Sequence, residues 1–274
     1  MSAGWLELRR ATPARIGLGC SGNALPTAAQ LDFQLAHARA RDAVHAALDV
    51  DCILAEISAL GMTTLHLRSR AADRATYLRR PDLGRRLEDA SRQILTRHSG
   101  EGRNPVHSRT SDGSLGPGLR RDDGNETCSI AFVIADGLSA TAVNAHAVPL
   151  IAAVLPPLAG LKVAPVGVVE QGRVAIGDEI GGLLGADLVV VLIGERPGLS
   201  AADSLGVYVT WAPAPGAIDA GRNCLSNVRP EGTPIPDAAT ALLRLIASAR
   251  EHRMTGVTLS RRLATKMEAQ DIDL

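Results

Sequence analysis

Carboxylates and glycines directly follow three short apolar runs in the second half of the chain. The runs and the residues after them are 130–135 with Asp136-Gly137, 163–169 with Glu170-Gln171-Gly172, and 188–193 with Gly194-Glu195-Arg196. A carboxylate in such a place can accept hydrogen bonds from a ligand or act as a general acid or base, and it can equally cap a helix. Glu170, Asp178 and Glu179 are the acid–base candidates on this reasoning.

Other arrangements that would indicate catalysis are missing from the sequence. His37, His45 and His66 do not share a helical face with a carboxylate, and the four cysteines form no CxxC pair, so we expect no metal site. There is no GxSxG motif, and Cys224 has no nearby histidine to activate it as a nucleophile. From its residues alone, the chain offers a ligand-binding crevice without catalytic residues of its own.

One glycine-rich segment, Gly17-Leu18-Gly19-Cys20-Ser21-Gly22, matches the GxGxxG pattern of dinucleotide-binding loops. That pattern holds a pyrophosphate only where it follows a strand and opens a helix, and residues 12–15 have the composition of a poor strand. We favour a glycine-rich loop that contacts a partner or ligand over a dinucleotide site.

The apolar runs after residue 128 alternate with helical patterns, which is typical of a parallel sheet covered by helices on both faces. Ligands of such sheets bind beyond the carboxyl ends of the strands, where the carboxylates and glycines are expected. We therefore predict an α/β fold, with a Rossmann-like three-layer domain and a parallel sheet over residues 128–274. A smaller, mainly helical N-terminal domain is expected over residues 1–96. The expected helices are 30–48, 50–60, 83–95, 139–158, 174–184 and 238–250, and the expected strands are 63–67, 130–135, 163–169, 188–193 and 207–211.

Residues 97–127 have a different composition from the rest of the chain. Gly, Ser, Arg, Asp and Asn dominate, and the few apolar residues follow no period. Such a segment cannot bury enough apolar surface to offset the entropy lost on ordering. The sequence therefore predicts a disordered and dispensable insertion here.

Charge and composition exclude several classes of function. The 29 Lys and Arg residues balance 29 Asp and Glu residues, and aromatic residues make up only 2%, so we expect no nucleic-acid binding. The longest apolar run, 147–158, is interrupted by prolines and is shorter than the roughly 20 residues that span a membrane. With scattered cysteines and no signal-peptide pattern in residues 1–20, we expect a soluble cytoplasmic protein.

Several segments occur in an order that belongs to one family. They are Pro26-Thr27, the runs from His37 to His45 and from Tyr77 to Arg85, ADGLSA at 135–140, EQGRVAIGD at 170–178, GERPGLS at 194–200, DSLG at 203–206 and RNCLSN at 222–227. Together they resemble the small (light) chain of ethanolamine ammonia-lyase. The resemblance covers about residues 15–95 and 129–259 and skips residues 97–127.

This resemblance implies a two-chain enzyme that depends on adenosylcobalamin (coenzyme B12) and converts ethanolamine to acetaldehyde and ammonia. In that family the large chain binds ethanolamine and performs the radical chemistry, while the small chain closes over the cobalamin and is not active alone. The family's small chain has a helical N-terminal part and a Rossmann-like part, and the enzyme is often associated with a bacterial microcompartment.

The family's cobalamin contacts correspond to Val174, Glu195 and Cys224. Glu195 is suited to accept hydrogen bonds from the amides of the corrin rim, and Val174 to make an apolar contact. Cys224 is expected to pack against the cofactor without binding cobalt. Two other functions stay open: a structural partner of the large chain without cofactor contacts, and a free-standing nucleotide-dependent enzyme.

Overall fold

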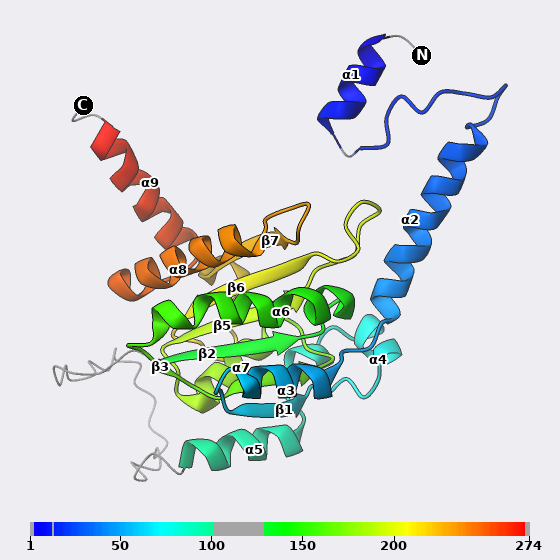
Figure 1. Cartoon of the computed structure of the whole chain (residues 1–274). Coiled ribbons are helices and arrows are strands. Elements are labelled where there is room, and N and C mark those ends of the chain that lie inside the picture. The colour runs from blue at the N-terminus through cyan, green and yellow to red at the C-terminus, as the bar shows by residue number, and fades with distance from the viewer. Residues whose placement is uncertain (1–2, 13, 101–128, 272–274) are drawn as a thin grey trace.

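A mixed β-sheet with helices on both faces forms the body of the chain (Figure 1). The computed structural model describes residues 3–12, 14–100 and 129–271. Over these residues the strands are β1 (Thr64–Arg68), β2 (Ser129–Ala135), β3 (Lys162–Val163), β4 (Val166–Glu170), β5 (Leu188–Gly194), β6 (Leu205–Trp211) and β7 (Arg222–Val228). The α-helices are α1 (Ala3–Ala11), α2 (Thr27–His45), α3 (Val50–Ala59), α4 (Arg74–Arg79), α5 (Asp89–Gly100), α6 (Ala140–Val154), α7 (Ile176–Leu184), α8 (Ile235–His252) and α9 (Val257–Asp271). Short 3₁₀ helices are η1 (Leu83–Arg85), η2 (Pro156–Leu158) and η3 (Asp219–Gly221).

The strand order is β1-β4-β2-β5-β6-β7, with β3 paired to β2 beside this path. The strands β1, β4, β2 and β5 are parallel, whereas β6 is antiparallel to both β5 and β7. The prediction of a parallel sheet is therefore wrong for the end of the sheet that β6 and β7 form. Only residues 195–204 join β5 to β6, without a helix, and a parallel return needs a crossover of a dozen or more residues.

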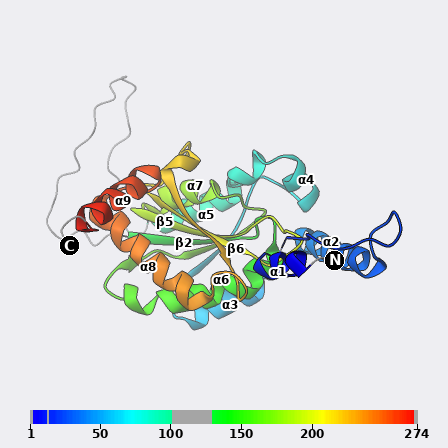
Figure 2. The ribbon, with the colours of Figure 1, turned by 90° about the horizontal axis from the view of Figure 1, so that it is seen from above.

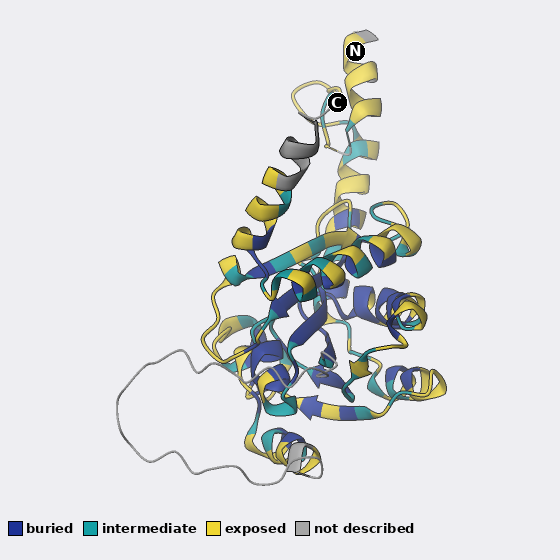
Figure 3. Cartoon of the chain, turned by 90° about the vertical axis from the view of Figure 1, so that its left-hand side faces the viewer, coloured by how far each residue is buried: buried dark blue, intermediate teal, exposed yellow. Residues whose placement is uncertain are grey.

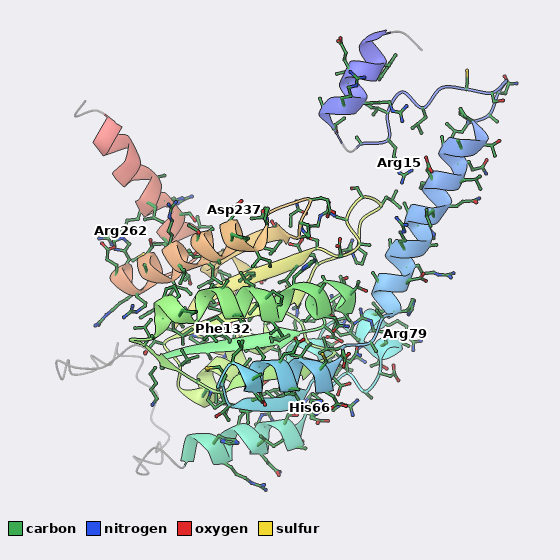
Figure 4. The ribbon with its side chains drawn as sticks, in the orientation of Figure 1. Arg15, His66, Arg79, Phe132, Asp237 and Arg262 are labelled. Carbon is green, nitrogen blue, oxygen red and sulfur yellow. The ribbon has the colours of Figure 1, made fainter. Side chains whose placement is uncertain are left out.

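Because side chains alternate along a strand, β2 supplies two separate cores. Ile130, Phe132 and Ile134 join the cluster formed with α3, α6 and α8, while Ala131 and Val133 face the cluster formed with α7 and part of α5. Figure 2 shows α3, α6 and α8 on one side of the sheet and α5 and α7 on the other. Figure 4 labels Phe132 on β2, within the first of these cores.

The N-terminal part of the chain contributes a strand to this sheet. β1 pairs with β4 over the full register from Thr64 opposite Val166 to Arg68 opposite Glu170. The helix α3 adds Ile53 and Ile57 to the first core. A helical unit confined to residues 1–96 does not describe this arrangement, because the sheet includes strands from both sides of residue 96. Of the segment 97–127, residues 97–100 end α5, and the rest lies outside the described residues.

The helix α2 projects from the body, with α1 near its far end (Figure 1). Figure 3 shows α2 as mostly exposed, in contrast to the buried strands. Its body end is fixed by Arg74 of α4, whose Nε donates to the carbonyl of Val44 at 2.6 Å. In the part of the chain that the structure describes, no helix has the length and hydrophobicity to cross a membrane.

Candidate functional site

A pocket of about 410 Å³ lies at the edge of the sheet where the parallel strands end. Its wall includes residues that follow β2, β4 and β5, namely Gly137 and Leu138, Arg173 and Val174, and Glu195 and Arg196. Tyr77 from α4 and Tyr208 from β6 complete it with Ile193 and Gly194. The register places Ala135 opposite both Val169 and Ile193, so these strands end at the same level.

Glu195 is held at the pocket through one of its two carboxylate oxygens. The Ser204 hydroxyl donates a short hydrogen bond to Oε2, and the backbone N–H of Asn227 donates to the same atom at 3.2 Å. The backbone N–H of Glu195 in turn donates to the carbonyl of Ser204 at 2.9 Å. Among the described residues, none donates a hydrogen bond to Oε1. The carboxylate is thus oriented by the protein and keeps one acceptor atom for a ligand.

Tyr208 connects Glu195 with Cys224. It lines the pocket from β6, and in the sheet register it lies opposite Cys224 on β7. Burial raises the pKa of Tyr208 to about 12, with Cys224 and Glu195 acting in the same direction, so the phenol stays protonated at neutral pH. Cys224 is exposed as a residue, but partial burial of its thiol raises the pKa of that group, although the contact with Tyr208 opposes this effect. A raised pKa leaves less of the reactive thiolate at neutral pH.

Asp136 fixes the loop that carries Arg173 and Val174. Its buried carboxylate accepts the backbone N–H groups of Gln171 at 3.0 Å and Gly172 at 2.9 Å. Burial raises the pKa of Asp136 to about 6, against the opposing influence of Arg74, whose Nη1 lies 3.5 Å from Oδ2. The Arg74 guanidinium also donates to the carbonyl of Gly137 at 2.8 Å. This network joins the ends of β2 and β4 with α4.

The aromatic ring of Tyr77 lies beneath the guanidinium groups of two arginines beside the pocket. The guanidinium carbons of Arg173 and Arg74 lie 4.2 Å and 4.7 Å from the centre of its ring, within the range of cation–π attraction. The Tyr77 hydroxyl donates to the carbonyl of Gly172 at 3.1 Å. The ring is fully buried, so the arginines rest on a fixed surface.

The structure brings Val174 and Glu195, two of the three residues that the resemblance singles out, into one pocket. Val174 is half-buried and packs on the core beneath α7. Cys224 does not line the pocket; it is exposed on β7, next to the pocket residue Tyr208. Two of the three residues therefore share a cavity, and the third borders it.

The acid–base candidates lie elsewhere and have structural partners. Glu170 accepts a hydrogen bond from His66 of β1, at 2.8 Å between Oε1 and Nε2 (His66 is labelled in Figure 4). Asp178 and Glu179, in the first turn of α7, are buried in ion pairs with Arg222 and Arg92. The pocket contains none of the three, so they have no access to a ligand there.

The glycine-rich segment at residues 17–22 does not follow a strand and does not open a helix, so it lacks the context of a dinucleotide loop. Within the described ranges, no group of three or more His, Cys, Asp or Glu side chains is arranged to hold a metal ion. The sequence reasoning missed Arg74, Tyr77 and Tyr208 as site residues. Arg74 and Tyr77 gave a weak signal, because they precede the α/β pattern by more than fifty residues and contact it only in the folded chain.

Comparison with known proteins gives matches over nearly the whole chain. The family described as ethanolamine ammonia-lyase light chain matches residues 2–260. The chain is similar to an ethanolamine ammonia-lyase small subunit from Pseudomonas syringae pv. tomato, with 51% identity over 257 residues, covering 93% of this chain and 82% of that protein. A small subunit from Pseudomonas fluorescens is 48% identical over 273 residues, covering 98% and 91%. One from Bradyrhizobium diazoefficiens is 50% identical over 257 residues, covering 93% and 89%. On this match, which spans both the N-terminal strand and the pocket loops, the chain belongs to the ethanolamine ammonia-lyase light chain family.

Proposed function

We propose that this chain forms one side of an adenosylcobalamin site in an enzyme that converts ethanolamine to acetaldehyde and ammonia. As the small subunit it acts with a large subunit. In this proposal the large subunit carries the substrate site, and the small subunit is inactive alone. Glu170, Asp178 and Glu179, the acid–base candidates of the sequence, lie outside the pocket, which supports a substrate site on the large subunit.

The observation that carries the proposal is the half-satisfied carboxylate of Glu195. Its Oε2 is held by Ser204 and Asn227, and its Oε1 makes no hydrogen bond within the described residues. The corrin rim of cobalamin carries primary amides, whose N–H groups need acceptors. A carboxylate that is already oriented loses little conformational entropy when it accepts such a bond.

The rest of the wall also suits a large cofactor that has both apolar and polar surface. Val174 and Leu138 offer aliphatic surface, and the protonated Tyr208 hydroxyl can donate to an amide carbonyl. Cys224, beside Tyr208, presents a small uncharged side chain at the border. Adenosylcobalamin, when bound, supplies radical chemistry through its own cobalt–carbon bond. The chain's own residues bind and orient it and exclude water from one side.

The test uses the assembled two-chain enzyme carrying Glu195→Ala in this chain. We expect cobalamin to bind about 10- to 100-fold more weakly, because a charge-assisted hydrogen bond of about 1.5–3 kcal/mol is lost. Binding is measured by titration with the corrin visible spectrum, and gel filtration checks that the complex stays intact.

The matched control is Glu251→Ala, which removes an exposed carboxylate from the last turns of α8. We expect unchanged cobalamin affinity for this variant. Unchanged affinity for Glu195→Ala in an intact complex would instead support the alternative, a purely structural subunit without cofactor contacts.

A further inference from the structure

Arg173 lines the pocket as a cation without a carboxylate partner. Among the described residues, no Asp or Glu lies within ion-pair distance of its guanidinium, whereas the neighbouring Arg74 has Asp136 at 3.5 Å. Arg196, at the pocket rim, likewise has no ion pair in the described part of the chain. The carboxylate of Glu195 is engaged by Ser204 and Asn227 instead. The carboxylate of Glu195 also lines the pocket, but it makes no ion pair with Arg173 or Arg196 in the described part of the chain, so neither guanidinium is in direct contact with an anion of the chain.

The guanidinium of Arg173 is nevertheless held in place. Its Nη2 donates to the carbonyl of Tyr77 at 3.1 Å, and its central carbon lies over the Tyr77 ring, 4.2 Å from the ring centre. The backbone N–H of Arg173 donates to the carbonyl of Gly84 at 2.8 Å. A Cβ at Gly84 would come within 2.8 Å of Arg173 Cγ, so the glycine makes room for the stem.

This fixed guanidinium has donors without acceptors. Nε is buried and has no hydrogen-bond partner, and Nη1 donates no hydrogen bond to a described residue. Leaving a charged donor unsatisfied is costly, and oxygens of a phosphate match the several N–H groups of an arginine better than a neutral amide does. An oriented, unneutralised arginine in a pocket wall is the arrangement expected for an anionic ligand group.

We propose that Arg173 binds the phosphodiester of the cofactor's nucleotide loop. This inference rests on the proposed function, because cobalamin must occupy the pocket for the contact to form. The phosphodiester is the one anionic group at the periphery of cobalamin, whose other side chains are amides. Glu195 and Arg173 then recognise opposite chemistries, the amide donors of the corrin rim and the phosphate oxygens.

The experiment compares three corrinoids on the assembled two-chain enzyme: cobalamin, cobinamide, which lacks the phosphate, ribose and base, and cobinamide phosphate, which regains the phosphate alone. We expect Arg173→Met to weaken cobalamin and cobinamide phosphate about 10- to 100-fold and to leave cobinamide unchanged. Methionine keeps the apolar stem over Gly84 and Tyr77. Arg173→Lys, which retains the charge, should recover part of the loss.

Two further arms make the result specific. Arg85→Met, which removes an exposed arginine outside the pocket, should leave all three affinities unchanged. Inorganic phosphate should compete with cobinamide phosphate in the unmodified enzyme and not in the Arg173→Met enzyme. Equal weakening of all three corrinoids by Arg173→Met, or no weakening of any, would overturn the inference.

Failure of this inference and failure of the proposed function give different patterns. If Glu195→Ala weakens all three corrinoids while Arg173→Met does not discriminate among them, only the phosphate contact is wrong. If neither variant changes any affinity in an intact complex, the cofactor does not bind at this pocket.

Discussion

At the scale of single residues, Glu195 and Arg173 are each held through one polar atom and keep another polar atom unpaired within the described part of the chain. Glu195 is held through Oε2, and Arg173 through Nη2, while another polar atom of each has no partner among the described residues. Such residues are restrained before a ligand arrives, which lowers the entropy lost on binding. Asp136 differs, because both of its oxygens are used to hold the loop of Gln171 and Gly172. Its role is therefore to position that loop.

The carboxyl group of Asp136 should make stability depend on pH. Burial raises its pKa from the ordinary 3.8 to about 6 in the folded chain, so the folded state favours the protonated form. Its contribution to the free energy of unfolding is complete below about pH 4 and is lost as the pH rises through about 6. The loss should be on the order of 3 kcal/mol for a shift of this size.

Asp136→Asn checks this expectation because asparagine does not titrate. We expect the excess stability of the unmodified chain over the variant to shrink between pH 4 and pH 6.5 in urea unfolding series. A difference between the two proteins that stays constant over this range would contradict the assignment to Asp136.

Gly194, at the end of β5, should not tolerate a side chain. A Cβ at this position would lie 2.0 Å from the carbonyl oxygen of Ser139 and 2.6 Å from that of Asp136. We expect Gly194→Ala to reduce the free energy of unfolding by about 1–3 kcal/mol, since backbone atoms must move apart. The control is Gly198→Ala, where the nearest atom would be 3.7 Å away. Equal melting temperatures for the two variants would show that this close approach does not limit the fold.

At the scale of elements, α7 is fastened on both sides by carboxylates of its first turn. Glu179 pairs with Arg92 of α5 and accepts the backbone N–H of Leu87 at 3.0 Å. Asp178 pairs with Arg222 of β7 through both oxygens, at 2.7 Å between Nη2 and Oδ2. Side chains of this second pair are only 2% exposed. The pair therefore connects α7 to the last strand of the sheet.

Breaking the buried pair from one side should be strongly destabilising. We expect Arg222→Met to lower the free energy of unfolding by about 3–5 kcal/mol, because Asp178 would remain buried without its cation. The double variant Asp178→Leu with Arg222→Met should recover much of this loss, as measured by urea unfolding. Arg80→Met, which removes the exposed pair with Asp82, serves as the control and should leave stability unchanged. A double variant no more stable than Arg222→Met would indicate that the contact geometry matters more than the uncompensated charge.

The most buried strands and several of the long helices were predictable, whereas the helix α9, the strand β7 and the bounds of two other elements were not. The apolar runs of β2 and β5 are fully buried or nearly so, and their composition alone distinguishes them. β7, with the sequence RNCLSNV, was missed because it is mostly polar and partly exposed. The expected helix 83–95 instead begins at Asp89, after the 3₁₀ turn η1 and an extended Arg86. The expected strand 163–169 is divided into β3 and β4, because Pro165 cannot donate a ladder hydrogen bond.

At the scale of the whole molecule, the two halves of the chain share one sheet and both cores. β1 forms an edge of the sheet beside β4, and Leu65 and Leu67 on it join the core beneath α7. Ile53 and Ile57 of α3 join the other core. The predicted boundary near residue 96 therefore separates parts that pack together.

Residues 129–274 should not fold alone. We expect this fragment to bind a hydrophobic dye and to unfold without a cooperative transition, because the faces that contact β1, α3 and α5 lose their apolar cover. Co-expression with residues 1–100 as a second fragment should restore a cooperative transition, measured by circular dichroism. A cooperative transition in the isolated fragment 129–274 would show that the C-terminal part is an independent domain.

The sequence by itself determined the α/β class, the loops that carry Val174 and Glu195, and the family, because strand composition and motif order are local properties of the chain. Tertiary structure decided what lies around these loops. The turn from parallel to antiparallel strands after β5 places Tyr208 in the pocket and Cys224 beside it. Because β1 pairs with β4, the residues that follow these two strands are close together, and among them Tyr77 lies beneath Arg173. The β1–β4 pairing and the contact of Tyr77 with Arg173 join residues about one hundred positions apart, and pairing at that distance depends on packing free energy that no local pattern records.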